Sequence, residues 1–308
     1  MPQSVKAGVL REMIKRYFMW SVRPVAVGLA LLCSAIDGRA TVYAIVLDNR
    51  VIAIASDSRK VLIDGNRITT ADSVEKVIPL GTKLAFMSSG VMEISGAASA
   101  IQLSELVRMC YSRLSKGSRR VSIKELATVF ATLTTNHLNR LTDSEKATVV
   151  SLAQRFGSQN SQVTESILAG LDRDGILKVE TIDFYMSSLT AAGNGGLRFD
   201  WSVVEAVAKP NPRVILSGEV TVLKSAFQAD ASPIRRIPSF EPWARAMEDG
   251  KQVNEEQTAE ALVDLTIKYA PPDGGRLGYP IFVYKLDVKN GFRRLRTVPS
   301  GKAVDLPH

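Results

Sequence analysis

The chain has 308 residues, of which 45% are hydrophobic and 23% are charged. This composition excludes collagen-like, coiled-coil and wholly disordered chains, and the length fits one large or two ordinary domains. The formal net charge is +8, but six of the 39 basic and two of the 31 acidic residues lie in residues 1–40, so the remaining 268 residues carry only +4. Because no dense Lys/Arg stripe alternates with aromatic residues, we expect no nucleic-acid partner.

Cysteine and histidine content removes further classes of protein. The only cysteines are Cys33 and Cys110, and the absence of a CxxC motif excludes a zinc ribbon or a thioredoxin-like site. If Cys33 is removed with a leader, Cys110 has no partner in its own chain, so the fold is not a disulfide scaffold. Two histidines are too few for a multi-His metal site, and His137 lies on an apolar helical stripe, which favours a structural role. We expect no metal and no cofactor.

The N-terminal residues have the pattern of a targeting segment. Residues 1–23 are basic, and residues 24–36 (PVAVGLALLCSAI) are almost continuously apolar, as in a secretory signal peptide. This run is shorter than the roughly 20 apolar residues that span a bilayer. An uncleaved membrane anchor and a cytosolic pro-segment are the two other interpretations. Small residues allow cleavage after Ala35 or after Ala40, and the second cut would leave Thr41 as the first residue. We therefore expect a secreted or periplasmic protein, with a membrane-anchored protein as the alternative.

The next part of the chain is predicted to be rich in strands. Residues 42–56 contain two β-branched, apolar runs on either side of the turn pair DN at 48–49, which predicts an antiparallel hairpin. The sequence DGN at 64–66 marks a second turn. Residues 83–88 predict another strand, which Gly90 is expected to end.

Helices are predicted to follow these strands. Apolar residues at helical spacing over 103–114 indicate the first helix. Ser122 and Glu125 form a capping box that predicts the start of the second helix, and apolar residues within 123–133 supply its buried face. Residues 143–156 are expected to extend this helical region.

The second half of the chain returns to strands. Strands are predicted at 165–171, 176–182, 213–217, 281–287 and 292–298, and a helix at 255–269. Residues 187–212, punctuated by Gly and Pro, predict a loop, and residues 229–242, with three prolines, predict an irregular insertion. Because strand hairpins are segregated from helices, the order favours α+β antiparallel sheets covered by helices over a βαβ doubly wound fold.

Four short segments in the first half carry a resemblance to a known family. They are TVYAIV at 41–46, VIAIASDSR at 51–59, SVEKVI at 73–78 and MSSG at 87–90. In this order they resemble the start of a proteasome β-type subunit, a member of the N-terminal-nucleophile hydrolases. Asp57 follows Thr41 by sixteen residues, as in that family. Later segments continue the resemblance, namely ILAGLDRDG at 167–175, LSG at 216–218 and the helix at 255–269.

The resemblance implies both a fold and a domain organisation. The fold is a four-layer α-β-β-α sandwich of two antiparallel sheets flanked by helices. Residues 1–40 would be a signal peptide or pro-segment, residues 41–300 a single domain with insertions near 187–212 and 219–250, and residues 301–308 a flexible tail. Because members of the family assemble into rings, the resemblance also implies a homo-oligomer.

The resemblance further implies a threonine protease, and the chemistry of the matched residues can be stated from first principles. A Thr hydroxyl is a weak nucleophile, and a free α-amine on Thr41 would hold a base beside it. A cation at Lys76 would lower the pKa of that amine from its ordinary value of about 8. Asp57 would pair with Lys76 and hold it in place. Gly90 would offer a backbone N–H to the oxyanion that develops on a peptide or amide substrate.

Other positions match the family less closely. Ser217 matches one of the family's serines that help to position the amine. Asp273 matches an Asp of the family, but Arg276 stands three residues later, where the family has the other such serine. Ala40 stands where the family has Gly before Thr, which favours signal peptidase over self-cleavage. Taken singly, each of these residues also has an ordinary structural interpretation. Two alternatives therefore stay open: a non-catalytic protein that uses the fold for binding or assembly, and a membrane-tethered protein that keeps residues 1–36.

Overall fold

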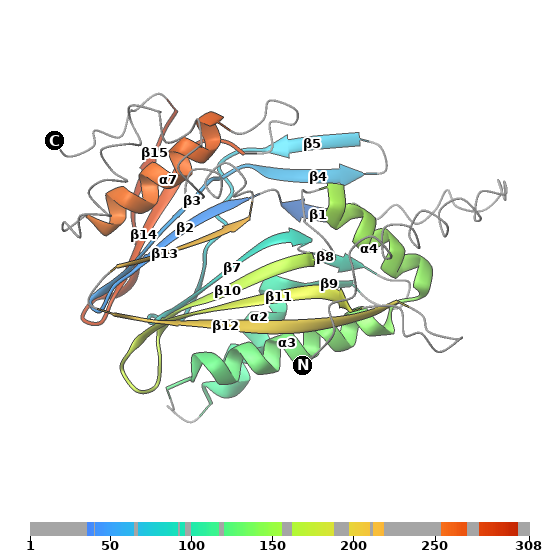
Figure 1. Ribbon diagram of the computed structural model, residues 1–308, viewed down its shortest axis with the longest axis horizontal. Helices are drawn as coiled ribbons and strands as arrows, with labels where there is room; N and C mark the ends of the chain where they lie inside the picture. The colour runs from blue at the N-terminus through green and yellow to red at the C-terminus, as the bar shows by residue number, and fades with distance from the viewer. Residues whose placement is uncertain are drawn as a thin grey trace, which may run out of the picture. The chain divides into compact units, whose positions relative to one another are not determined.

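The computed structural model describes eleven segments of the chain (Figure 1). They are residues 36–39, 41–64, 67–91, 93–95, 100–116, 120–155, 162–187, 197–209, 212–218, 254–269 and 277–300. Several sequence predictions lie outside these ranges: the apolar run of the leader with Cys33, both candidate cleavage residues Ala35 and Ala40, the insertion at 229–242, Asp273, Arg276, His308 and the tail.

Two antiparallel sheets form the body of the described structure. The larger sheet has eight strands in the order β12-β11-β10-β7-β1-β4-β5, with β6 also paired to β7. Its strands are β1 (Ile36–Arg39), β4 (Lys60–Asp64), β5 (Arg67–Ala71), β6 (Ile78–Leu80), β7 (Leu84–Val91), β10 (Gln162–Leu171), β11 (Leu177–Ser187) and β12 (Arg198–Val207).

The smaller sheet has five strands in the order β13-β2-β3-β14-β15. Its strands are β13 (Arg213–Gly218), β2 (Val42–Leu47), β3 (Val51–Ser56), β14 (Ile281–Asp287) and β15 (Gly291–Val298). A separate two-stranded ribbon consists of β8 (Glu93–Ser95) and β9 (Ala100–Gln102).

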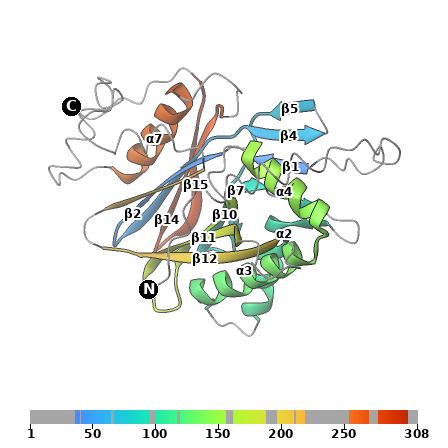
Figure 2. The same cartoon turned by 45° about the vertical axis from the view of Figure 1, so that its right-hand side comes forward.

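Helices cover the outer faces of the two sheets (Figures 1 and 2). The larger sheet packs against α2 (Leu103–Leu114), α3 (Ile123–Arg140) and α4 (Asp143–Arg155), and the smaller sheet packs against α7 (Glu255–Tyr269). A third apolar cluster lies between the sheets, with side chains from β2, β3 and β14 facing side chains from β7, β10 and β11. The predicted α+β class with two antiparallel sheets and covering helices is therefore confirmed.

Alternation along β2 explains how one strand serves two cores. Val42, Ala44 and Val46 face α7, whereas Tyr43 and Ile45 face the larger sheet. Every residue of β2 is buried, as expected for a strand covered on both faces. The side chains of even and odd positions thus stabilise different layers, and odd positions point toward the space between the sheets.

The N-cap hydrogen bond of the predicted capping box is present at the start of α3. The side chain of Ser122 accepts a hydrogen bond from the backbone N–H of Glu125 at 3.4 Å. The apolar residues behind it, including Phe130, are buried against β10–β12. Phe130 stacks edge-on between Phe86 of β7 and Phe184 of β11, so the helix is held by aromatic as well as aliphatic contacts.

Two local predictions were wrong. The segment predicted as a loop at 187–212 contains β12, whose Phe199, Trp201 and Val203 alternate toward α3. Flanking Gly and Pro residues outweighed this alternation in the sequence analysis. Gly90 does not end β7, which continues to Val91: Gly90 has φ +88° but is still paired with Arg39 of β1 and Thr164 of β10.

Candidate active site

Thr41 directly precedes Val42, the first residue of β2. It is fully buried, and its Oγ1 has no hydrogen-bond partner among the described residues. Position 41 is odd, like Tyr43 and Ile45, so the alternation of β2 directs this side chain toward the larger sheet. Thr41 thus supplies a buried hydroxyl immediately before β2 of the smaller sheet.

Asp57 joins Thr41's strand to Lys76. One carboxylate oxygen, Oδ1, accepts from the backbone N–H of Val42 at 3.0 Å and from Lys76 Nζ at 2.8 Å. The other oxygen, Oδ2, accepts from the backbone N–H of Arg59 at 3.1 Å. Burial raises the pKa of Asp57, while the Lys76 ammonium and the two backbone donors oppose that rise. The same oxygen thus ties the residue after Thr41 to a lysine 19 residues further along the chain.

Lys76 is completely buried, which rules out the alternative that it is an ordinary solvated lysine. It lies between β5 and β6, in a segment that docks on Ser58 through a hydrogen bond from the backbone N–H of Val74 to the Ser58 carbonyl at 3.0 Å. Its ion pair with Asp57 has no solvent exposure on either side chain. Since an isolated buried charge is costly, the two groups are strongly interdependent.

Gly90 lies in β7 beside the chain that leads into Thr41. Strand β1 occupies the position between β7 and β4, and pairs Arg39 with Gly90 and Gly38 with Val91. A side chain at Gly90 would be strained at φ +88° and would place its Cβ 2.8 Å from the carbonyl oxygen of Val163. Glycine is therefore required at this crowded position. Arg39, two residues before Thr41, pairs with it across the sheet.

Ser217 and Gly218 at the end of β13 complete the surroundings of Thr41. Ser217 is opposite Tyr43 in the register, and its buried Oγ has no hydrogen-bond partner among the described residues. Gly218 is opposite Val42 at φ +87°, and a Cβ there would overlap the carbonyl oxygen of Thr41. Ser217 therefore lies on β13, the neighbour of β2 in the sheet, opposite Tyr43 and two residues along from Thr41. Asp273 lies outside the described residues.

One residue near this site was missed in the sequence analysis. Tyr43 is fully buried, and its hydroxyl donates to the carbonyl oxygens of Ser88 at 3.0 Å and Lys76 at 3.4 Å. A tyrosine in an otherwise aliphatic strand was the available signal, because a buried phenol needs a hydrogen-bond partner. Sequence alone gave no indication that this partner would include the Lys76 backbone.

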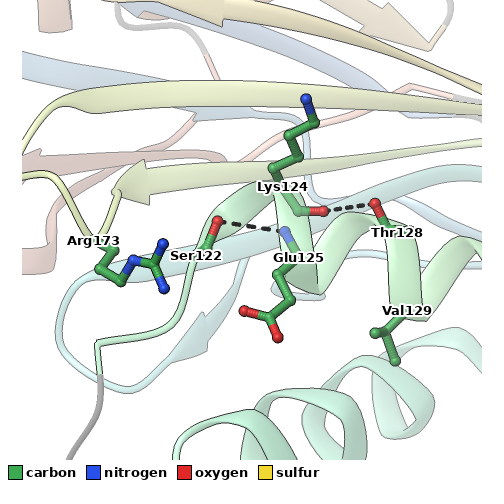
Figure 3. A pocket seen from close by; sticks show the side chains of 6 residues that line it. All are labelled: Ser122, Lys124, Glu125, Thr128, Val129 and Arg173. Atoms are coloured by element: carbon green, nitrogen blue, oxygen red, sulfur yellow. Dashed lines mark hydrogen bonds between the residues drawn. The ribbon is translucent and has the colours of Figure 1, made fainter.

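Three further observations concern the described parts of the chain away from Thr41. Figure 3 shows a surface hollow at the start of α3. None of the predicted site residues lines it; its lining residues are Ser122, Lys124, Glu125, Thr128, Val129 and Arg173. Within the described ranges, His, Cys, Asp and Glu side chains nowhere gather in a group of three or more that could hold a metal. In those same ranges, no helix combines the length and apolar character needed to cross a membrane.

A scan against protein-family models matches no family, and a search of curated proteins finds no match.

Proposed function

We propose that this chain is an exported threonine-type hydrolase of the N-terminal-nucleophile superfamily, with the proteasome-like four-layer fold. The observation that carries the proposal is the fully buried arrangement in which Asp57 Oδ1 joins the backbone beside Thr41 to the Lys76 ammonium. Thr, Asp and Lys are the residue types that the family resemblance assigns, in this order, to the site of an N-terminal threonine nucleophile. Two antiparallel sheets with helices on both outer faces support the same assignment.

The proposed reaction begins only after the bond between Ala40 and Thr41 is cut. The freed α-amine then takes the proton of the Thr41 hydroxyl as the oxygen attacks the substrate carbonyl. The amine passes this proton to the leaving nitrogen, the C–N bond breaks, and an ester to Thr41 remains. Water, deprotonated by the same amine, hydrolyses the ester and restores the hydroxyl. Lys76 favours the neutral amine that this cycle needs, because a nearby cation disfavours a second positive charge.

Strand β1 supports a peptide as the substrate class. Residues 36–39 run as an extended strand between β7 and β4, with Arg39 opposite Gly90. If residues 1–40 leave, the facing edges of β7 and β4 lose this partner, and an extended peptide can pair with them in its place. The Gly90 backbone then lies beside the substrate main chain, where an N–H can stabilise the oxyanion.

The proposal is tested first by the N-terminus of the protein isolated from its native compartment. Intact mass and N-terminal sequencing should identify a chain that begins at Thr41. That chain should cleave members of a mixed peptide library, with products identified by mass spectrometry. We expect Thr41→Ala to abolish cleavage and Thr41→Ser to retain part of it, because only the serine variant keeps a hydroxyl beside the amine.

Thr134→Ala is the matched control for these variants. Thr134 in α3 is also fully buried, and its Oγ1 likewise has no hydrogen-bond partner among the described residues. Both substitutions to alanine therefore remove a similar buried group, but only one removes the proposed nucleophile. Cleavage by Thr41→Ala at the rate of Thr134→Ala would refute a threonine mechanism.

A second candidate function is a non-catalytic binding or assembly protein that keeps its leader. The pairing of β1 with β4 and β7 favours it, because residues 36–39 are integrated into the larger sheet. In that form the nitrogen of Thr41 remains an amide and cannot act as a base. A native protein that begins before Thr41 and cleaves no peptide would support this alternative.

A further inference from the structure

A buried phenol connects the proposed nucleophile strand with the proposed catalytic lysine. Tyr43 is two residues after Thr41 on β2, and its side chain is fully buried between the sheets. Its hydroxyl donates to the Ser88 carbonyl at 3.0 Å and contacts the Lys76 carbonyl at 3.4 Å. A tyrosine hydroxyl has a single proton, so the shorter contact is the stronger hydrogen bond and the longer one is secondary.

These contacts fix Lys76 at its main chain as well as at its side chain. The ammonium is held by Asp57 Oδ1 at 2.8 Å, and the carbonyl lies against the Tyr43 hydroxyl. Ser88, the other acceptor, is two residues before Gly90 on β7. The phenol therefore joins β2, the Lys76 segment and β7, which are the three pieces of chain that must keep their relative positions for the proposed reaction.

We propose that Tyr43 is a positioning residue that sets the distance between the Lys76 ammonium and the Thr41 amine, an inference that rests on the proposed function. The effect of a cation on a neighbouring amine falls as their separation grows. A displacement of Lys76 therefore weakens its effect on the amine without removing any charge. In this proposal Tyr43 contributes a hydrogen bond and steric support and is not itself a reacting group.

Charged side chains of the described residues lie close to Lys76 in space or in the chain. Asp57 is in direct contact with Lys76. The hydrogen bond from Arg59 is the main cause that lowers the pKa of Asp72, and the charge of Lys76 lowers it a little further. Arg59 pairs with Asp72 at 2.7 Å, and Glu75 is the exposed neighbour of Lys76 in the chain. Replacing the Tyr43 hydroxyl leaves all of these charges in place, so a change in the pH profile reports position rather than charge.

The experiment compares Tyr43→Phe with Tyr284→Phe in protein matured from the full-length chain. Tyr284 is a buried tyrosine in the same cluster between the sheets, and its hydroxyl has no hydrogen-bond partner within the described ranges. The pKa of the Thr41 amine is measured without substrate, from the pH dependence of its acetylation by trace acetic anhydride. Peptide cleavage is followed in parallel between pH 5 and pH 9, and near-ultraviolet circular dichroism reports the folded fraction.

We expect Tyr43→Phe to raise the pKa of the Thr41 amine and to move the acid limb of kcat to higher pH. A rise of one in pKa lowers the neutral fraction about tenfold well below the pKa, so the loss of kcat should be larger at pH 6 than at pH 8. KM should stay unchanged, because no proposed substrate contact is altered. Tyr284→Phe should keep the wild-type amine pKa and pH profile.

Three results would overturn the inference, and each has its own signature. An ordinary amine pKa in the wild-type protein overturns the proposed function and this inference with it. A lowered wild-type pKa that Tyr43→Phe leaves unchanged overturns the inference alone. A Tyr43→Phe protein that loses folded fraction but keeps the wild-type pH profile shows that the hydroxyl supports the fold and not the position of Lys76.

Discussion

Gly218→Ala should damage the fold and the proposed site together, because the added methyl group would overlap the carbonyl oxygen of Thr41. Gly218 also has φ +87°, a left-handed conformation that costs a non-glycine residue about 1–2 kcal/mol. Forcing an extra carbon into a packed position costs typically about 1–3 kcal/mol more. We therefore expect a total loss of roughly 2–5 kcal/mol in the free energy of unfolding.

Gly175→Ala separates the two contributions. Gly175 has φ +83°, but a Cβ built there meets no atom within 4 Å. This variant should lose only the backbone part, about 1–2 kcal/mol, and should keep its activity. Urea unfolding gives both stabilities, and peptide cleavage gives the activities. Equal stability losses in the two variants, or full activity in Gly218→Ala, would refute the inferred contact between Gly218 and Thr41.

Two further predictions concern buried ionisable groups. Lys76→Met should cost about 3–5 kcal/mol in the free energy of unfolding, because it leaves the Asp57 charge buried without its cationic partner. The double variant Asp57→Asn/Lys76→Met should regain most of that stability but no peptide cleavage. A double variant that cleaves peptides would exclude Lys76 from the mechanism. Burial, and then the charge of Glu205, raise the pKa of Glu180 from 4.5 to about 7. The folded state thus binds this proton more tightly than the unfolded state, so stability should fall by up to a few kcal/mol between about pH 4.5 and pH 7, at about 1.4 kcal/mol for each pKa difference of one. Urea titrations at several pH values should show that the free energy of unfolding falls less with rising pH in Glu180→Gln than in the wild-type protein. An equal fall in both proteins would contradict the inferred effect of burial on Glu180.

The strands and helices nearest the proposed site could be predicted because local and long-range preferences agree there. The hairpin of β2 and β3 has β-branched runs around a polar turn, and the helix at Glu255–Tyr269 has the predicted bounds. Asp57 and Lys76 could be selected only through their order and spacing in the family resemblance. Their pairing at 2.8 Å depends on how β3 and the segment before β6 dock, which no local pattern encodes.

The strands that were missed depend on tertiary pairing. Strand β1 is four residues long and comes from a segment predicted to be a leader, so it has no independent signal. It exists as a strand because β4 and β7 offer hydrogen-bonding edges on both of its sides. Strand β12 contains an alternating pattern, but it is flanked by Gly-rich and Pro-containing sequence that indicates a loop. The alternation of β12 matches a strand with one buried face, but that face is buried only because α3 packs against Phe199.

The burial of Asp57 and Lys76 is itself an argument for a function at this place in the fold. Neither side chain is exposed, and taking two charges out of water costs several kcal/mol for each ion before their attraction is counted. A well-packed apolar pair of similar volume often stabilises a protein as well or better. The pair therefore contributes little net stability that apolar residues could not supply. What apolar residues could not supply is a fixed positive charge, held through the one carboxylate oxygen that also accepts from the backbone N–H of Val42, the residue after Thr41.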